Sequence, residues 1–210
     1  MTFRHPGSWC PVFVTAAAIA ALAAQGLGRA APATAATSAR REIFNGRDFT
    51  GWKLPKEPYW HVEDGAIVGE SDADKKGSML YTEQAYGDVD FEAEFRFQGD
   101  VDSGVMMRKP ETQVQIGVSR SLKRDMTGSF YVGKYPEEAQ AKRAGELLKP
   151  GEWNRLRIVA RGDTFTVWLN GEQVSTYTSP AHPAPAPIGL QIHQDVRMKV
   201  EFRNLKAGEP

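Results

Sequence analysis

Short runs of alternating apolar and polar residues recur from residue 42 to the C-terminus, and turn-forming residues separate them. The longest run covers residues 88–97, where the apolar members are Val89, Phe91, Ala93, Phe95 and Phe97. Successive side chains of a β-strand point to opposite faces, so a period of two predicts a strand with one buried and one polar face. The polar face, which carries Glu92, Glu94 and Arg96, is expected either to be solvated or to line the floor of a cleft.

Glycine-containing pairs mark tight turns between the runs. Asp64-Gly65 predicts a hairpin across residues 60–69, and Asn170-Gly171 predicts another between residues 164–169 and 174–177. Residues 137–148 have the composition of one short helix, which we expect to act as a flap over a site. About twelve short strands with one modest helix predict an all-β fold, a two-sheet antiparallel sandwich of the jelly-roll type.

The first forty residues differ from the rest of the chain. Arg4 and His5 precede an apolar, alanine-rich run over residues 11–27, and a tail of small residues follows. This layout is typical of a secretory signal peptide. A membrane anchor is less consistent with it, because the apolar run is shorter than the roughly 20 residues that a spanning helix needs. We therefore expect residues 1–40 to be a signal peptide and low-complexity leader. Residues 41–210 would form a single domain without a transmembrane segment, in the periplasm or secreted.

Cysteine content and charge narrow the function of that domain. Cys10 is the only cysteine and lies in the leader, so neither disulfides nor thiolate chemistry is expected in the mature chain. The leader carries three arginines and no acidic residue, which leaves the rest with a formal charge of about −3. There is no basic stripe of the kind that binds phosphate backbones, so nucleic acid is not an expected partner. The sequence indicates no oligomeric state.

Polar side chains interrupt three otherwise apolar strands. These strands are residues 102–108, 113–116 and 189–193. The first begins with Asp102 and ends with Arg108. Gln113 and Gln115 share one face of the second strand, and Gln191 and His193 share one face of the third. If the strands share a sheet face, these side chains form a polar pocket. Two alternatives stay open, because His193 can be a structural histidine and Arg108 can be an ion-pair partner of Asp102 or Glu111.

A calcium loop is not expected in this region. Residues 100–104 resemble the start of such a loop and Glu111 follows at the right interval, but Val105 stands where the loop requires glycine. No cofactor is evident, and no residue pattern supports a divalent metal.

Nine motifs in register carry a family likeness. They are Phe44-Asn45-Gly46-Arg47-Asp48-Phe49-Thr50-Gly51-Trp52, residues 60–69, 103–108, 113–116 and 127–131, Gly151-Glu152-Trp153-Asn154, Leu169-Asn170-Gly171, and residues 189–193 and 200–204. In this order and spacing residues 42–206 resemble the 3-keto-disaccharide hydrolase domain family, which has a concanavalin A-like jelly-roll fold and is frequent in exported bacterial proteins.

The resemblance implies a carbohydrate substrate and an enzymatic activity. Members act on glycosides that are oxidised at carbon 3, and cleave the glycosidic bond by hydrolysis or by elimination followed by hydration. A ketone at carbon 3 makes the hydrogen at carbon 2 acidic, so such a site needs a base and a group that stabilises the enolate. On this resemblance His193 is the base and Arg108 the enolate stabiliser, while Gln113, Gln115, Gln191 and Tyr131 bind the substrate.

Two positions depart from the family pattern. Gln113 stands where many members have an acidic residue, and Gly117 stands where aspartate is frequent. Neither residue exchanges a proton or offers a charge to a metal, which argues against a metal-dependent or acid-assisted mechanism. The alternative hypothesis is therefore a non-catalytic carbohydrate-binding module on the same fold.

Overall fold

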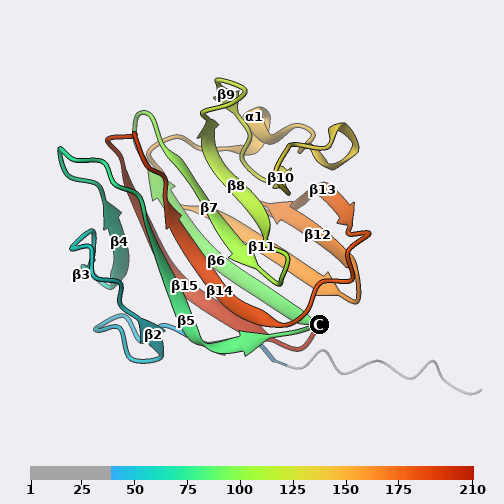
Figure 1. Cartoon of the computed structure of the whole chain (residues 1–210), viewed down its shortest axis with the longest axis horizontal. Coiled ribbons are helices and arrows are strands. Elements are labelled where there is room, and N and C mark those ends of the chain that lie inside the picture. Colours follow the sequence, from blue (N-terminus) through green and yellow to red (C-terminus); the bar gives the residue numbers. More distant parts are fainter. Residues whose placement is uncertain (1–38) are drawn as a thin grey trace, which may run out of the picture. The chain divides into compact units, whose positions relative to one another are not determined.

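Two antiparallel β-sheets pack face to face in the computed structural model, which describes residues 39–210 (Figure 1). The two-sheet antiparallel sandwich expected from the sequence is confirmed. The predicted signal peptide, residues 1–40, lies outside the described residues except for its last two positions. None of the helices in the described part is long and apolar enough to cross a membrane.

Sheet A has eight strands within residues 39–210. In spatial order seven of them run β13-β12-β11-β6-β15-β4-β3, and β1 pairs with β15. Their bounds are β1 (Arg41–Glu42), β3 (Trp60–Glu63), β4 (Ala66–Glu70), β6 (Val89–Phe97), β11 (Asn154–Arg161), β12 (Thr164–Leu169), β13 (Glu172–Thr178) and β15 (Lys199–Gly208).

Sheet B has seven strands among the described residues. Six of them run β10-β8-β7-β14-β5-β2, and β9 pairs with β8. Their bounds are β2 (Trp52–Lys53), β5 (Ser78–Tyr86), β7 (Asp102–Met107), β8 (Thr112–Ser119), β9 (Arg124–Asp125), β10 (Phe130–Tyr131) and β14 (Ala186–Ile192). The centre of this sheet therefore joins β7 and β8 to β14, which comes about 70 residues later in the chain.

The two hairpins that the sequence predicts are present. Asp64 and Gly65 connect β3 to β4, and Asn170 and Gly171 connect β12 to β13. All four residues have positive φ angles, between 48° and 94°. Such angles match the right-handed twist of the flanking strands, which is why asparagine, aspartate and glycine are preferred there.

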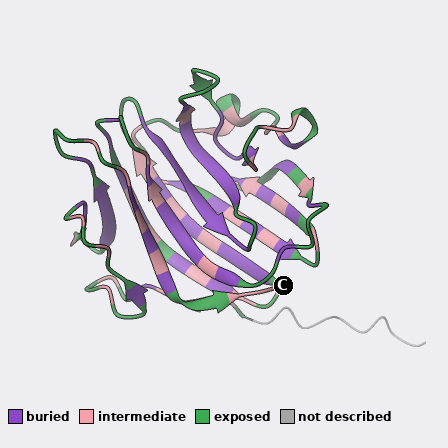
Figure 2. Ribbon diagram, viewed as in Figure 1, coloured by how far each residue is buried: buried purple, intermediate pink, exposed green. Residues whose placement is uncertain are grey.

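The core lies between the sheets and is built from alternate residues of each strand. In β6 the side chains of Val89, Phe91, Ala93 and Phe95 are all buried, as the period of two predicts. Sheet B supplies the opposing layer through residues such as Leu190, and Figure 2 shows buried positions along the central strands of both sheets. Each large apolar side chain buried in this way stabilises the fold by roughly 1.5–3 kcal/mol.

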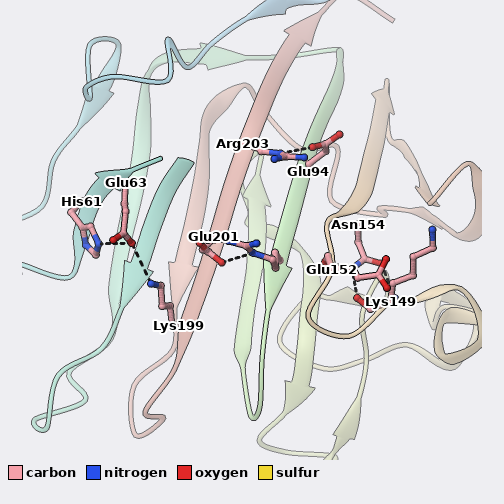
Figure 3. Close-up of polar contacts among 10 residues, drawn as sticks. His61, Glu63, Glu94, Lys149, Glu152, Asn154, Lys199, Glu201 and Arg203 are labelled. Atoms are coloured by element: carbon pink, nitrogen blue, oxygen red, sulfur yellow. Dashed lines mark hydrogen bonds and ion pairs between the residues drawn. The ribbon is translucent and has the colours of Figure 1, made fainter. Parts of the chain in front are cut away.

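The opposite face of β6 is an ion-paired surface. Figure 3 shows Arg203 directed at Glu94, whose carboxylate lies 2.6 Å from the arginine Nε. Glu201 pairs in the same way with Arg96, at 2.7 Å. Trp153 lies under both guanidinium groups, with its ring centroid 4.0 Å from Cζ of Arg203 and 4.6 Å from Cζ of Arg96. These contacts favour the solvated-surface interpretation of this face over the cleft.

The segment expected to be one helix is broken. It contains a 3₁₀ turn, Glu137–Ala139, and a single α-helical turn, α1 (Ala144–Leu147). Between them the backbone N–H of Ala141 donates to Ser129 Oγ, and that of Lys142 donates to the carbonyl of Val174. The prediction of a continuous helix is wrong because these tertiary hydrogen bonds replace the helical ones.

Candidate functional site

The register of sheet B places polar side chains from three strands next to one another. Gly104 of β7 pairs with Gln115 of β8, and Met106 pairs with Gln113. On the other side of β7, Gly189 of β14 pairs with Met106. These residues alternate with the core-facing ones, so they lie on the outer face of sheet B.

A hollow on this face, which we call the glutamine groove, has a volume of about 150 Å³. It is lined by Asp102, Gln113, Gln115, Ser119, Arg120, Ser121, Tyr131, Tyr135, Gln191 and His193. Five of the six site residues expected from the sequence therefore line one hollow: Gln113, Gln115, Gln191, Tyr131 and His193. The sixth, Arg108, does not.

A chain of hydrogen bonds that starts at Asp102 orients the glutamines. The Asp102 carboxylate only accepts, so Gln115 turns its Nε2 toward it, at 2.7 Å, and its Oε1 away. Gln115 Oε1 accepts from Gln113 Nε2 at 2.7 Å. The same Gln113 nitrogen donates to Gln191 Oε1 at 3.1 Å. The amide nitrogen of Gln191 is then the atom at the end of this chain that is left to donate to a ligand.

The position of Asp102 explains why Gln113 is not an acid. Asp102 and Gln115 are 3% and 1% exposed, and Asp102 also accepts the backbone N–H of Arg120 at 2.9 Å. A glutamate at position 113 would turn an acceptor toward Gln115 Oε1 and Gln191 Oε1, which are acceptors themselves. The acidic residue of the groove is therefore Asp102 on β7, and the amide of Gln113 on β8 supplies the donor that this hydrogen-bond chain requires.

Two glycines make room for this arrangement. A Cβ at Gly104 would lie 2.6 Å from Gln113 Nε2, so glycine lets that side chain cross β7 toward Gln191. Gly117 has φ +86°, and a Cβ there would collide with the carbonyl oxygen of Val101. An aspartate at position 117 is therefore sterically incompatible with this backbone.

Two tyrosines close one side of the groove. The hydroxyl of Tyr135 donates to Gln115 Oε1 at 3.0 Å, and its ring packs against that of Tyr131 with centroids 5.0 Å apart. Burial, with a further contribution from the negative charge of Asp102, raises the pKa of Tyr135 to about 12. Tyr135 therefore remains a hydrogen-bond donor across the whole range in which enzymes work.

The hydrogen bond of His193 fixes its tautomer. Its Nδ1 lies 2.7 Å from the carbonyl oxygen of Gln194, which can only accept. Nδ1 must then carry the proton, and a neutral ring has its lone pair on Nε2. The backbone N–H of His193 donates to the carbonyl of Asp102 at 3.2 Å, which holds the residue beside β7. A half-buried histidine with a free Nε2 is competent to act as a base.

The guanidinium group of Arg108 points to the core side of sheet B. It follows Met107, the last residue of β7, and its φ of +66° breaks the alternation of the strand. Its guanidinium packs 5.8 Å from the ring centroid of Phe165, a core residue of sheet A. It donates to Asp88 at 2.8 Å and to the carbonyls of Pro183 and Gly162.

These contacts separate Arg108 from the groove. Its side chain is 5% exposed and ties three loops at the edge of the sandwich. Neither alternative from the sequence describes it fully, because its carboxylate partner is Asp88 rather than Asp102 or Glu111. The placement assigns Arg108 to the support of the fold.

Sequence reasoning missed five residues that line the groove, and two of them, Asp102 and Tyr135, hold Gln115 in place. Asp102 was considered only as an ion-pair partner of Arg108, although it lies two residues from Gly104 and so shares its face. Tyr135 belongs to the segment after β10, and no local pattern marks it. Among residues 39–210 no three histidine, cysteine or acidic side chains come together to hold a metal ion.

A family model described as the 3-keto-alpha-glucoside-1,2-lyase-like domain matches residues 39–207. The chain belongs to this family. The likeness seen in the sequence is thereby confirmed, and membership makes this a carbohydrate-active type of protein. No curated protein matches the chain closely enough to count as a relative.

Solved structures similar to this member of the 3-keto-α-glucoside-1,2-lyase-like family include enzymes and binding modules. A candidate glycosyl hydrolase of Parabacteroides distasonis is 23% identical, with 81% of this chain and 94% of that one covered and a TM-score of 0.61. A β-glucanase of Bacillus licheniformis is 14% identical, with coverages of 84% and 99% and a TM-score of 0.57. A carbohydrate-binding module of Bacillus subtilis is 15% identical, with coverages of 78% and 98% and a TM-score of 0.51. At these identities the likenesses show the concanavalin A-like fold alone.

Proposed function

We propose that this protein is an exported enzyme that cleaves 3-keto-glycosides, with His193 as the base. Family membership supports the substrate class, and the leader-like residues 1–40 support export to the periplasm or beyond. The observation that carries the proposal is the contact of His193 Nδ1 with the carbonyl of Gln194, which leaves the lone pair of the neutral ring on Nε2, in a groove lined with amide groups.

The reaction follows from the acidity of carbon 2. His193 Nε2 takes the proton from carbon 2, and the electron pair forms an enolate whose oxygen is the former ketone oxygen. When the ketone re-forms, the pair moves to the bond between carbons 1 and 2, and the leaving alkoxide departs from carbon 1. The alkoxide takes up one proton, and water then adds across the new double bond to give the free 3-keto sugar. General base catalysis of this kind contributes roughly 10²–10⁴-fold.

The enolate needs a donor, and Arg108 does not reach the groove. Gln191 presents its amide nitrogen there, because its Oε1 accepts from Gln113. Tyr131 lines the same groove and offers a hydroxyl. We assign the stabilisation of the enolate oxygen to these two residues, and the binding of sugar hydroxyls to Gln113 and Gln115. Donors that are held in place before the reaction stabilise developing charge without reorganisation.

The test compares two histidine variants on a 3-keto-disaccharide. His193→Ala is expected to lower the rate of monosaccharide release at least about 100-fold while the melting temperature stays near that of the wild type. His61→Ala is the matched control, because His61 lies on β3 in sheet A and is exposed. Full activity of His193→Ala would end the assignment. Elimination is distinguished from direct hydrolysis in ²H₂O, where rehydration places deuterium at carbon 2 beyond the amount that exchanges into the substrate and product without enzyme.

A carbohydrate-binding module is the second candidate. The amide chain of the groove can recognise sugar hydroxyls without any chemistry, and one similar structure is itself a carbohydrate-binding module. This candidate predicts saturable binding of the 3-keto-disaccharide to the wild type with no released monosaccharide. Binding should then survive His193→Ala.

A further inference from the structure

A second hollow, which we call the Tyr81 hollow, lies beside the end of β7, where Met107 and Arg108 also line it. Its volume is about 290 Å³, roughly twice that of the glutamine groove. Tyr81, Met106 and Pro187 contribute to its walls. None of these residues belongs to the lining of the groove.

Two strands, β7 and β14, contribute side chains to both hollows. Along β14, Gln191 lines the groove and Pro187 lines the Tyr81 hollow, with Gly189 between them. In the neighbouring strand pair, Gln113 of β8 is directly opposite Met106 of β7. A strand advances roughly 3.3 Å per residue, so Pro187 and Gln191 are roughly 13 Å apart along β14, whereas Gln113 and Met106 are direct neighbours at the boundary. A ligand that fills one hollow therefore has room to extend into the other.

Tyr81 lies across the boundary between the hollows. A Cβ at Gly189 would be 2.6 Å and 2.8 Å from two carbons of the Tyr81 ring, so the ring rests directly on the backbone of β14. Its hydroxyl donates to Glu111 Oε1 in the turn between β7 and β8, at 3.0 Å. The ring is thus held at both ends, by β5 through its own backbone and by Glu111 through its hydroxyl. A fixed, half-exposed aromatic ring is a suitable platform for the apolar face of a sugar.

We propose that the Tyr81 hollow binds the departing sugar of a glycoside whose 3-keto ring occupies the glutamine groove. This proposal rests on the function proposed above and adds that the substrate is a disaccharide. The scissile bond then spans the boundary near Gly189.

The lining of the hollow fits a sugar rather than an apolar leaving group. Met106 and Pro187 provide an apolar floor beside the Tyr81 ring, and the C–H face of a pyranose is apolar as well. The exposed side chains of Lys53, Lys109 and Glu111 stand around it and can bind hydroxyl groups. A purely apolar group would desolvate these charges without replacing their hydrogen bonds, which is unfavourable.

The test measures variant effects on two substrates with the same 3-keto ring, a 3-keto-disaccharide and the methyl 3-keto-glucoside. Tyr81→Ala is expected to lower kcat/KM about tenfold for the disaccharide and less than about twofold for the methyl glycoside. Tyr81→Phe keeps the ring and is expected to stay within about twofold for both. Trp168→Ala, which removes a half-buried ring that packs on Arg157 in sheet A, is the control.

A second variant covers the case in which Tyr81→Ala does not fold. Glu111 is exposed in a turn, so Glu111→Ala spares the core. Because it removes a carboxylate that can bind sugar hydroxyls, it is expected to lower kcat/KM about threefold for the disaccharide alone. Equal losses on both substrates, or no loss on either, would overturn the proposal and leave the proposed function intact. If the wild type cleaves neither substrate, the proposed enzymatic function is wrong. The Tyr81 hollow is then tested by calorimetric Kd values for the same two ligands, and the variants should weaken binding of the disaccharide but not of the methyl glycoside.

Discussion

Asp102→Asn is the most informative change in the groove, because Asp102 sets the direction of every amide that follows it. Its two oxygens accept from Gln115 Nε2 at 2.7 Å and from the Arg120 N–H at 2.9 Å. Asparagine has the same shape but only one oxygen, so one of the two donors must face an NH₂ group. If Gln115 turns over to compensate, Gln113 and Gln191 must follow it.

The magnitude follows from burial and charge. Asp102 is 3% exposed, and a hydrogen bond to a buried charged group contributes about 1.5–3 kcal/mol. Loss of one such bond predicts that Asp102→Asn lowers the free energy of unfolding by about 2 kcal/mol. For a domain of this size 1 kcal/mol corresponds to roughly 2–4 °C, so the melting temperature should fall by roughly 4–8 °C.

Urea denaturation at neutral pH measures this change directly, with Asp100→Asn as the control. Asp100 carries the same group two residues earlier, but its carboxylate is 58% exposed and pairs only with the Arg120 side chain. An exposed pair of this kind contributes at most about 1 kcal/mol. The reasoning would be refuted if both variants lost the same free energy, because the buried acceptor would then have no special part in the fold.

Two further predictions concern charges outside the groove. Arg108→Met leaves the carbonyls of Pro183 and Gly162 without their donor and should lower the free energy of unfolding by about 3 kcal/mol, since each buried acceptor that loses its partner costs about 1–3 kcal/mol. A variant of normal stability without turnover would instead support a catalytic role. Burial acts to raise the pKa of Asp90, but the hydrogen bonds and charge of Arg157 outweigh it and leave the pKa below its ordinary value. A carboxyl whose pKa is lower in the folded state adds stability that is present above its ordinary pKa, near 3.9, and lost as pH falls through the folded value. Urea titrations should therefore show a steeper loss of stability in the wild type than in Asp90→Asn as pH falls below about 4, and parallel profiles would contradict this.

Local signals in the sequence were enough for most of the elements. The alternation in residues 88–97 and the pairs at Asp64-Gly65 and Asn170-Gly171 act over a few residues, and the structure confirms them. The helix over residues 137–148 failed because hydrogen bonds to Ser129 and Val174 compete with the helical ones. Such partners are distant in sequence and leave no local pattern.

In the groove, too, the features within one strand were predictable from the sequence, and those that depend on distant residues were not. Gln113 and Gln115 share a face by alternation, as do Gln191 and His193, so each pair was predictable from its own strand. The prediction of one pocket depended on the three strands sharing a sheet face. The structure meets this condition, because β14 pairs with β7 although about 85 residues separate them in the chain. Arg108 was misplaced because a single positive φ at the end of β7 turns its side chain away from the outer face.

The sequence by itself determined the strands, their buried and polar faces, the turns and the family. Only the tertiary structure decided that Asp102 is the acid of the groove, because its role depends on the register between β7 and β8. Only the structure, likewise, showed that the Arg108 side chain lies outside the groove, because its position is set by hydrogen bonds to the distant residues Asp88, Gly162 and Pro183. Alternation is a property of the backbone of one strand, whereas a site is a property of the register between several.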